Sequence, residues 1–432
     1  MKVLKIIFAS ILLLISIVFL GFESLKAYSA PDYKGTEYLS GITSTVKIIY
    51  DEYGIPHIYA SNEEDAYYAL GYVYARDRLF QTQIFKIISS GRLSEFLGTK
   101  LLDTDMFLRT LGLRNSARKN ADKFFSNQDK KYHKSFNAYL DGFNAYMMNG
   151  KLPVEFYILG LKREKLEPVD SYSIINLLAY GFTLSAIQES VSSYIAYKYG
   201  DNYLEDFYFG EKPNNFNSSI EVDTVQIKEL IGYNNKILSV IDKYNIKPWN
   251  ASNSWVIGKK KSKTGQVILA NDTHFAYSEP GAWYEAEISY PGYNFYGLYL
   301  PGVPFPVIGH NQNFGWGLTI FPFDNSNYYL EKIDTITNKV MYKNNWVDIA
   351  SRKEIIKIKG EKDYELEVKE TPHNSLISSY DAILKKNIPQ NISLWWTLNN
   401  IELLLWNASM ICQELIISMN SSEQYHLSMY LD

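Results

Sequence analysis

The sequence predicts an α+β protein whose first half is mostly helical and whose second half is rich in strands. A strand–turn–strand pattern covers residues 45–60, and apolar residues then recur at spacings of three and four through about residue 199. Beyond residue 249, short alternating runs are broken by turns. We therefore expect helices before this change of period and antiparallel strands after it.

The helical half opens with a start signal at Asn62. The side chain of Asn62 can cap a helix, and three acidic residues follow it directly, where the helix dipole favours negative charge. Apolar residues keep the helical spacing from there to Leu97. The sequence therefore predicts a long helix that begins next to Asn62.

The second half consists of short segments with strand character. Many of them have one polar and one apolar face, which is typical of antiparallel strands that cover a core on one side. The predicted strands are residues 254–258, 266–270, 282–290, 293–300, 328–333, 353–358 and 364–368.

Composition is that of a soluble globular protein. Of the 432 residues, 46% are hydrophobic and 21% are charged, which argues against disordered and fibrous classes. The net charge is -4, and the densest basic stretch, residues 259–261, is better explained as a solvated strand end or turn, so we expect no nucleic acid partner. Cys412 is the single cysteine, so no intramolecular disulfide can form, and its apolar surroundings indicate a buried, inert thiol.

The N-terminus departs from this average. Lys2 and Lys5 precede an apolar run over residues 6–22, and small residues follow at 27–30. This pattern is typical of a signal peptide. The run is at the short end of what crosses a bilayer, which favours export with cleavage over a retained inner-membrane anchor. Both alternatives place the body of the chain outside the inner membrane, either in the periplasm or anchored to the membrane.

These changes in composition and in hydrophobic periodicity divide the chain into four parts. Residues 1–30 form the signal peptide or membrane anchor, and residues 31–220 form the mostly helical region. Residues 221–251 are amphipathic and charged, which suits either a surface helix with a loop or a removable spacer. Residues 252–432 form the sheet-rich region.

Common hydrolase and cofactor motifs are absent from the sequence. It contains no Gly-x-Ser-x-Gly elbow, no His-Glu-x-x-His pair, no Gly-rich phosphate loop and no Cys-x-x-Cys. The 6 histidines are too scattered to indicate a metal cluster. Ordinary serine-hydrolase and metal-hydrolase mechanisms therefore have no local support.

The segment over residues 250–258 lies where the helical spacing of apolar residues gives way to the alternation typical of strands. Ala251 is small, so the hydroxyl of Ser252 can approach the carbonyl in front of it. The first residue of a strand is also a position from which a new N-terminus can project at a sheet edge. By themselves, however, these residues are better explained by a turn that enters a strand.

Ordered sequence blocks on both sides of this serine change that interpretation. The blocks are residues 51–60, 71–81, 90–98, 271–275, 301–304 and 308–319. In this order and separation they resemble the penicillin acylase family of N-terminal nucleophile hydrolases, from about residue 45 to residue 397. The resemblance implies an αββα four-layer sandwich, with two stacked antiparallel sheets flanked by helices. It also implies an exported amidohydrolase that acts on a small N-acyl substrate of the penicillin or acyl-homoserine-lactone class.

The resemblance gives the central role to Ser252. This residue matches the serine that becomes the first residue of the β subunit after autoproteolysis, so we expect a cut between Ala251 and Ser252 and an α/β heterodimer as the product. The free α-amine of Ser252 then acts as the base, because its ordinary pKa is about 7.7 to 8.0. The hydroxyl attacks the substrate amide and gives an acyl-enzyme that water hydrolyses.

Further site residues follow from the same resemblance. Asn253 and Trp255 match supporting residues of the motif, and Trp255 is expected to contact the substrate. His274 is expected to orient the serine, the alternative being a hydrogen-bonded structural histidine. Phe275 would line the acyl pocket, and the backbone N–H of Ile320 would form half of an oxyanion hole.

Members of that family often hold a calcium ion between the two chains, although the chemistry needs no cofactor. Asp324 matches one ligand, Asn327 stands at the position of a second aspartate, and Glu189 matches a ligand from the other chain. The amide of Asn327 removes one charge, which weakens a site for a hard cation. A turn-capping role explains Asp324 equally well.

The resemblance fades after residue 397. The segment that would supply the oxyanion-hole asparagine has no counterpart in residues 421–432, so we expect a chain truncated at the C-terminal side of the sandwich. Losing one oxyanion donor costs about a hundred-fold or more in rate. Two alternatives to an active enzyme therefore stay open: a catalytically inactive remnant, and a membrane-anchored binding protein that keeps the pocket.

Overall fold

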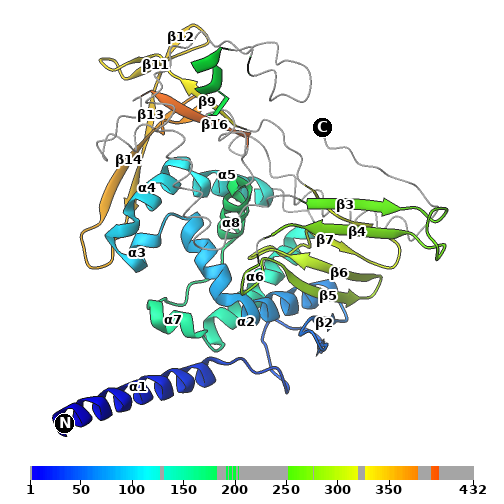
Figure 1. Cartoon of the computed structure of the whole chain (residues 1–432). Coiled ribbons are helices and arrows are strands. Elements are labelled where there is room, and N and C mark those ends of the chain that lie inside the picture. Colours follow the sequence, from blue (N-terminus) through cyan, green and yellow to red (C-terminus); the bar gives the residue numbers. More distant parts are fainter. Residues whose placement is uncertain are drawn as a thin grey trace.

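The computed structural model describes residues 2–126, 131–181, 252–275, 277–319, 326–377 and 391–397, together with residues 191–192, 194–196, 198–200 and 203 (Figure 1). Within these residues, long helices precede residue 200 and strands predominate after residue 251. The predicted α+β class is therefore confirmed.

Helices α2 to α8 lie in the region for which the sequence predicted helices. Their bounds are α1 (Lys2–Ser29), α2 (Glu63–Ser89), α3 (Leu93–Leu97), α4 (Leu102–Leu111), α5 (Leu113–Ser126), α6 (Lys131–Asn149), α7 (Val154–Leu159) and α8 (Pro168–Gly181), with a 3-10 turn at Thr99–Leu101. The start of α2 is as predicted, because the side chain of Asn62 accepts a hydrogen bond from the backbone N–H of Asp65 at 2.8 Å. The Asp65 carboxylate accepts hydrogen bonds from the backbone N–H groups of Thr43 and Ser44, which fixes the chain leading into the helix.

The strands coincide with the predicted segments and add several short ones. Their bounds are β1 (Lys47–Tyr50), β2 (Pro56–Tyr59), β3 (Ser252–Ile257), β4 (Ile268–Thr273), β5 (Tyr284–Tyr290), β6 (Tyr293–Tyr299), β7 (Ile308–His310), β8 (Gly315–Trp316), β9 (Ser326–Leu330), β10 (Ile333–Asp334), β11 (Lys339–Tyr342), β12 (Asn345–Asp348), β13 (Ala350–Ile356), β14 (Tyr364–Thr371), β15 (Asn374–Ser375) and β16 (Ile392–Trp396). In the described residues they form one six-stranded sheet and four smaller sheets of two or three strands.

The six-stranded sheet has the order β1-β2-β5-β6-β7-β8 and joins the two parts of the chain. Strand β2 lies beside β5, with His57 opposite Glu287 and Tyr59 opposite Ser289. This pairing is parallel, whereas the other pairs in the sheet are antiparallel. The strands after residue 251 pair antiparallel with one another as expected, but the expected antiparallel sheet contains one parallel pair at this junction. The alternation of polar and apolar residues along a strand does not indicate whether the neighbouring strand is parallel or antiparallel, so it could not predict the β2–β5 pair.

Helices α2 and α6 form a layer beside this sheet. Tyr74 of α2 packs on Tyr284 of β5, with ring centroids 4.6 Å apart. The two helices approach each other closely because glycine stands at their contact. A Cβ atom on Gly71 would lie 1.9 Å from the carbonyl oxygen of Tyr139, and one on Gly142 would lie 1.9 Å from that of Tyr68. Any larger residue at these two positions would push the helices apart.

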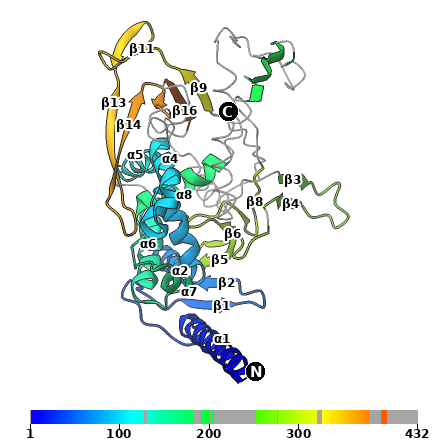
Figure 2. The same cartoon turned by 60° about the vertical axis from the view of Figure 1, so that its left-hand side comes forward.

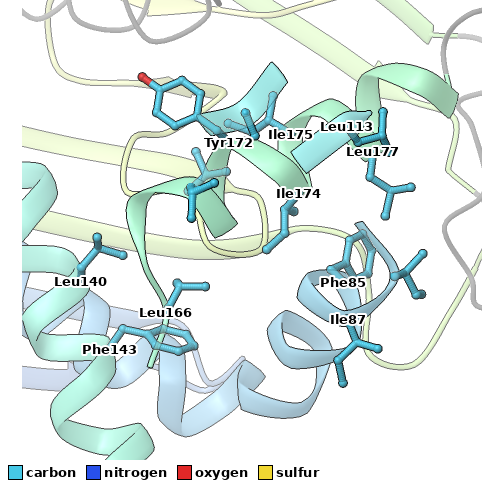
Figure 3. Close-up of a cluster of buried hydrophobic side chains, with 14 of the residues drawn as sticks. Phe85, Ile87, Leu113, Leu140, Phe143, Leu166, Tyr172, Ile174, Ile175 and Leu177 are labelled. Atoms are coloured by element: carbon cyan, nitrogen blue, oxygen red, sulfur yellow. The ribbon is translucent and has the colours of Figure 1, made fainter. Parts of the chain in front are cut away.

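A hydrophobic core also forms among the helices themselves (Figure 3). The side chains labelled there are Phe85 and Ile87 on α2, Leu113 on α5, Leu140 and Phe143 on α6, Leu166 just before α8, and Tyr172, Ile174, Ile175 and Leu177 on α8. Full burial of one such side chain contributes about 1.5–3 kcal/mol. The helices and the six-stranded sheet share one hydrophobic core, because Tyr284, Ile288 and Phe295 of the sheet belong to the same cluster.

A second attachment between the two parts involves the hairpin β13–β14, which lies along α4 and α3 (Figures 1 and 2). Arg109 of α4 forms an ion pair with Glu354 of β13 at 2.8 Å. Nη2 of Arg352 donates a hydrogen bond to the carbonyl of Arg109 at 2.7 Å. The sheet and this hairpin hold the helical and strand-rich parts together independently of the peptide bond before Ser252.

Candidate active site

Ser252 is the first residue of β3, in the two-stranded hairpin β3–β4. The register places Ser252 opposite Thr273. The hairpin forms because two strand segments flank a turn in which Gly265 adopts a positive φ of 70°, a conformation that costs glycine little. Residues 259–261 lie in this turn and are exposed, as predicted for the basic stretch.

Thr319 contacts both the hydroxyl and the carbonyl group of Ser252. The Thr319 hydroxyl donates to the Ser252 carbonyl oxygen at 3.0 Å, and the two side-chain oxygens lie 2.8 Å apart. A hydroxyl carries one proton, so Thr319 accepts in the second contact and the Ser252 hydroxyl donates. Ser252 is half-buried and Thr319 is exposed, so solvent reaches the pair.

Asn271 ties the loop that carries Thr319 to strand β3. The Asn271 amide nitrogen donates to the carbonyl oxygens of Asn253 at 3.0 Å and of Leu318 at 2.9 Å. The Asn271 oxygen accepts from the N–H of Leu318 at 2.9 Å. The loop fits closely, since a Cβ atom on Gly317 would lie 2.7 Å from the Asn271 oxygen. Asn271 therefore fixes the position of Thr319 relative to Ser252.

His274 belongs to a second polar group on the other side of β3. Side chains alternate along a strand, so Asn253 points to the face opposite Ser252. Nε2 of His274 lies 3.3 Å from Nδ2 of Asn253 and 3.0 Å from Oδ2 of Asp272. Nε2 donates to Asp272 when it carries a proton and accepts from Asn253 when it does not. His274 thus contacts the residue that follows Ser252.

An aromatic pair lies at the end of β4. The indole N–H of Trp283 donates to Oγ1 of Thr273 at 2.9 Å, and Thr273 is the residue opposite Ser252. The ring of Phe275 packs edge-on against Trp283, with centroids 5.4 Å apart. The hydrogen bond to Thr273 thus places this aromatic pair beside the strand position opposite Ser252. Trp255 is separate from this pair, because alternation places that side chain on the Asn253 face, where it is 51% exposed.

Other predicted positions lie outside the described residues. They are Ala251, Glu189, Ile320, Asp324 and Cys412. Asn327 is described and lies in β9, opposite Trp395 of β16. Within the described ranges, no group of three His, Cys, Asp or Glu side chains could hold a metal ion. The other two predicted calcium ligands lie outside the described residues, so the calcium site stays a prediction.

Three residues around the serine escaped the sequence analysis: Thr319, Asn271 and Trp283. Thr319 and Asn271 lie inside the blocks that carry the family resemblance, and this position is the sequence feature that could have pointed to them. Their roles depend on partners far away in the chain, since Asn271 and Leu318 are 47 residues apart. The periodicity of a sequence does not report hydrogen bonds between uncharged polar side chains and distant segments.

The start of β3, with Ser252, the Thr319 loop and the polar group around His274, is therefore the candidate site. The family model described as penicillin amidase matches residues 45–425. The chain therefore belongs to the penicillin amidase family, and the resemblance inferred from the ordered blocks is confirmed.

Curated relatives carry acylase names. The acyl-homoserine lactone acylase QuiP of Pseudomonas aeruginosa is 30% identical over 382 residues, which cover 85% of this chain and 44% of that protein. Penicillin acylase 2 proenzyme of Pseudomonas sp. (strain SE83) is 28% identical over 369 residues, covering 82% of this chain and 46% of that protein. Penicillin G acylase of Escherichia coli is 24% identical over 390 residues, covering 78% and 46%. The chain thus spans less than half the length of these relatives.

A solved structure of a thermostable penicillin G acylase from Alcaligenes faecalis also matches. It is 22% identical, covers 41% of this chain and 98% of that chain, and superposes with a TM-score of 0.31. A superposition of this quality carries no argument about the arrangement of layers.

Proposed function

We propose that this chain is an exported amidohydrolase precursor of the penicillin acylase type. It cleaves itself between Ala251 and Ser252 and then hydrolyses N-acyl amide bonds through the new N-terminal serine. The observation that carries the proposal is the position of Ser252 at the start of β3, with the Thr319 hydroxyl on both its side chain and its carbonyl. The acylase names of the relatives supply the reaction class.

Self-cleavage begins with attack of the Ser252 hydroxyl on the carbonyl carbon of Ala251. A carbon–oxygen bond forms, the carbon–nitrogen bond breaks, and the nitrogen gains the hydroxyl proton. Water then hydrolyses the ester, leaving a carboxylate on Ala251 and an α-amine on Ser252. In the precursor this nitrogen is an amide and cannot act as a base. The hydrogen bond from Ser252 to Thr319 is therefore the described interaction that orients the hydroxyl.

Turnover uses the amine that self-cleavage creates. Its ordinary pKa of about 7.7 to 8.0 leaves a useful neutral fraction near pH 7 to 8. The neutral amine accepts the Ser252 proton as the oxygen attacks the substrate carbonyl, and the leaving amine takes that proton. The resulting ester is hydrolysed by water with the same amine as base. The backbone N–H of Ile320, directly after Thr319 in sequence, is the proposed donor to the oxyanion.

The surroundings of Ser252 have separate roles in this scheme. Asn271 keeps the Thr319 loop on β3, and His274 positions the first residues of the strand through Asn253. Phe275 and Trp283 provide apolar surface for the acyl group of a penicillin or an acyl-homoserine lactone. The two products of the cut stay associated as an α/β heterodimer, supported by the β2–β5 pairing and the hairpin on α4. The four-layer αββα sandwich is the architecture we propose for the assembled fold.

Direct hydrolysis assays test the reaction class. The full chain is incubated with penicillin G and with a long-chain N-acyl-homoserine lactone, and release of 6-aminopenicillanic acid or homoserine lactone is followed. The proposal expects release from at least one substrate and none from the Ser252→Ala variant. Self-cleavage without release from either substrate would assign the chain to the binding-protein alternative, and no self-cleavage would assign it to the inactive remnant.

A further inference from the structure

Helix α1 is an apolar rod that projects from the body beneath α7 in both views (Figures 1 and 2). Among the described residues it is the one helix that is long and apolar enough to cross a membrane, and its apolar window is entirely exposed. The composition of α1 does not distinguish a cleaved signal peptide from a retained membrane anchor, because both share it. The contacts between the C-terminal end of α1 and the rest of the protein bear on this distinction.

The C-terminal end of α1 contacts α7 and Lys151 just before it. The ring of Tyr28 packs edge-on against Tyr157 of α7, with centroids 6.3 Å apart. Nζ of Lys151 donates to the carbonyl of Ala30 at 3.0 Å, and Ser29 is buried. The Ala30 N–H still bonds to the Lys26 carbonyl at 3.0 Å, so the helical backbone runs through the small residues of the expected cleavage site. A peptidase would have to unwind this end and detach it from α7.

The corner around α7 exposes three apolar side chains close together in the chain. Ile158 is 63% exposed, Tyr157 is 44% exposed and Met148 is 41% exposed. Phe156 is buried, so α7 is anchored from the inside while Tyr157 and Ile158 point outward. Lys151 and Lys162 are exposed nearby along the chain. Apolar and aromatic side chains bordered by lysine are the composition of membrane-interface segments.

Distances along α1 put this corner at the level of lipid headgroups. Residues 6–22 extend about 26 Å at about 1.5 Å per residue, close to the hydrocarbon thickness of about 30 Å. Tyr28 lies about 9 Å further along the axis than residue 22, and a centred run leaves about 2 Å of hydrocarbon beyond that residue. Tyr28 is then about 7 Å outside the hydrocarbon, within a headgroup layer about 5–8 Å thick. Tyr28 and its partner Tyr157 therefore fall where tyrosine is enriched in membrane proteins.

We propose that α1 is retained as a membrane anchor and that the α7 corner, formed by Met148, Lys151, Tyr157, Ile158 and Lys162, rests on the surface of an anionic bilayer. The apolar side chains enter the headgroup boundary and the lysines attract anionic lipid. The anchor thereby holds the body in one orientation instead of on a free tether. This inference is independent of the chemistry at Ser252.

Site-specific fluorescence in the full chain tests the contact. The chain carries Cys412→Ser and Ser252→Ala, so that it has no native thiol and stays in one piece. Single cysteines replace Ile158, Phe19 as the buried reference, or Ile336, which is 94% exposed on the β10–β11 turn. Each is labelled with an environment-sensitive dye, and the protein is reconstituted into vesicles of phosphatidylethanolamine and phosphatidylglycerol containing brominated lipid.

The expected result is quenching and a blue shift at positions 158 and 19 and neither effect at position 336. Mass spectrometry of protein purified from the membranes of expressing cells is expected to recover the N-terminal residues. Quenching at 19 without quenching at 158 overturns the proposed surface and leaves the corner to another partner, such as a second copy of the chain. Recovery of a chain that begins after residue 22 overturns the anchor.

Discussion

Oγ of Ser252 lies 2.8 Å from Oγ1 of Thr319, although 67 residues separate them in the sequence. The contact joins the start of β3 to the loop after β8, and the same threonine also binds the Ser252 carbonyl. One side chain thus fixes the hydroxyl that is proposed to attack and the backbone beside it. Substitutions of Thr319 therefore test the site without removing the proposed nucleophile.

Thr319→Val keeps the shape of the side chain but loses both hydrogen bonds. Each such bond contributes about 0.5–1.5 kcal/mol, so we expect self-cleavage to slow about 10-fold. Thr319→Ser retains the hydroxyl and is expected to cleave at close to the normal rate. A time course of fragment appearance on a denaturing gel measures both, and equal rates for the valine and serine variants would count against an orienting role.

Asn271→Leu removes the side chain that ties the Thr319 loop to β3. The N–H and carbonyl of Leu318 and the carbonyl of Asn253 then lose their partners, and we expect a loss of about 1–3 kcal/mol in unfolding free energy together with slower self-cleavage.

Asn149→Leu is the matched control for this variant. Asn149 is an exposed asparagine that bonds only within its own helix turn, to the carbonyl of Ala145. Urea unfolding compares the two proteins. The account is wrong if both substitutions cost the same stability and leave cleavage at the same rate.

Phe275→Ala removes one ring of the proposed acyl wall. We expect the KM for long or aromatic acyl groups to rise about 10-fold, because about 1.5 kcal/mol of apolar contact is lost, while kcat changes less. An acetyl substrate, which barely reaches the wall, serves as the comparison. Trp255→Ala tests the opposite face of β3. A larger KM effect at Trp255 than at Phe275 would place the acyl group on that face instead.

His57 gives the chain a predictable pH dependence. Its ring forms an ion pair with Glu287 of β5 and approaches Asp51 at 3.6 Å. The hydrogen bond to Glu287, and secondarily the charges of Glu287 and Asp51, raise the pKa of His57 above its ordinary 6.5 despite partial burial. Because the folded pKa is the higher one, this stabilisation is complete below about pH 6.5 and is lost as the pH rises through the folded pKa.

We therefore expect His57→Gln to lower the unfolding free energy more at pH 6 than at pH 9. Urea titrations of the variant and the unchanged protein at the two pH values measure the difference. A cost that is the same at both would show that protonated His57 does not stabilise the β2–β5 junction.

Local sequence patterns predicted the elements better than their assembly. The Asn62 cap and the strands over 284–290 and 293–299 follow from residues close together in the chain. The parallel β2–β5 pairing does not, because His57 and Glu287 are 230 residues apart. Nor does the docking of β13 on α4, where Arg109 and Glu354 are 245 residues apart. Two-residue strands such as β8 are too short to show any period.

The site was accessible to sequence analysis only through the family blocks. They pointed to Ser252 and His274, whereas no pattern pointed to Thr319 or Trp283, whose contacts form only on folding. The position of Trp255 was predictable from geometry alone. It stands three residues after Ser252 in a strand, so alternation puts it on the opposite face.

The most direct measurement is the N-terminal sequence of the fragments formed when the full chain is expressed and purified. The account predicts a fragment that begins at Ser252 and a partner that ends at Ala251, with neither formed by the Ser252→Ala variant. A chain that stays whole under conditions where it is folded, or a cut at any other bond that persists in the variant, would contradict it.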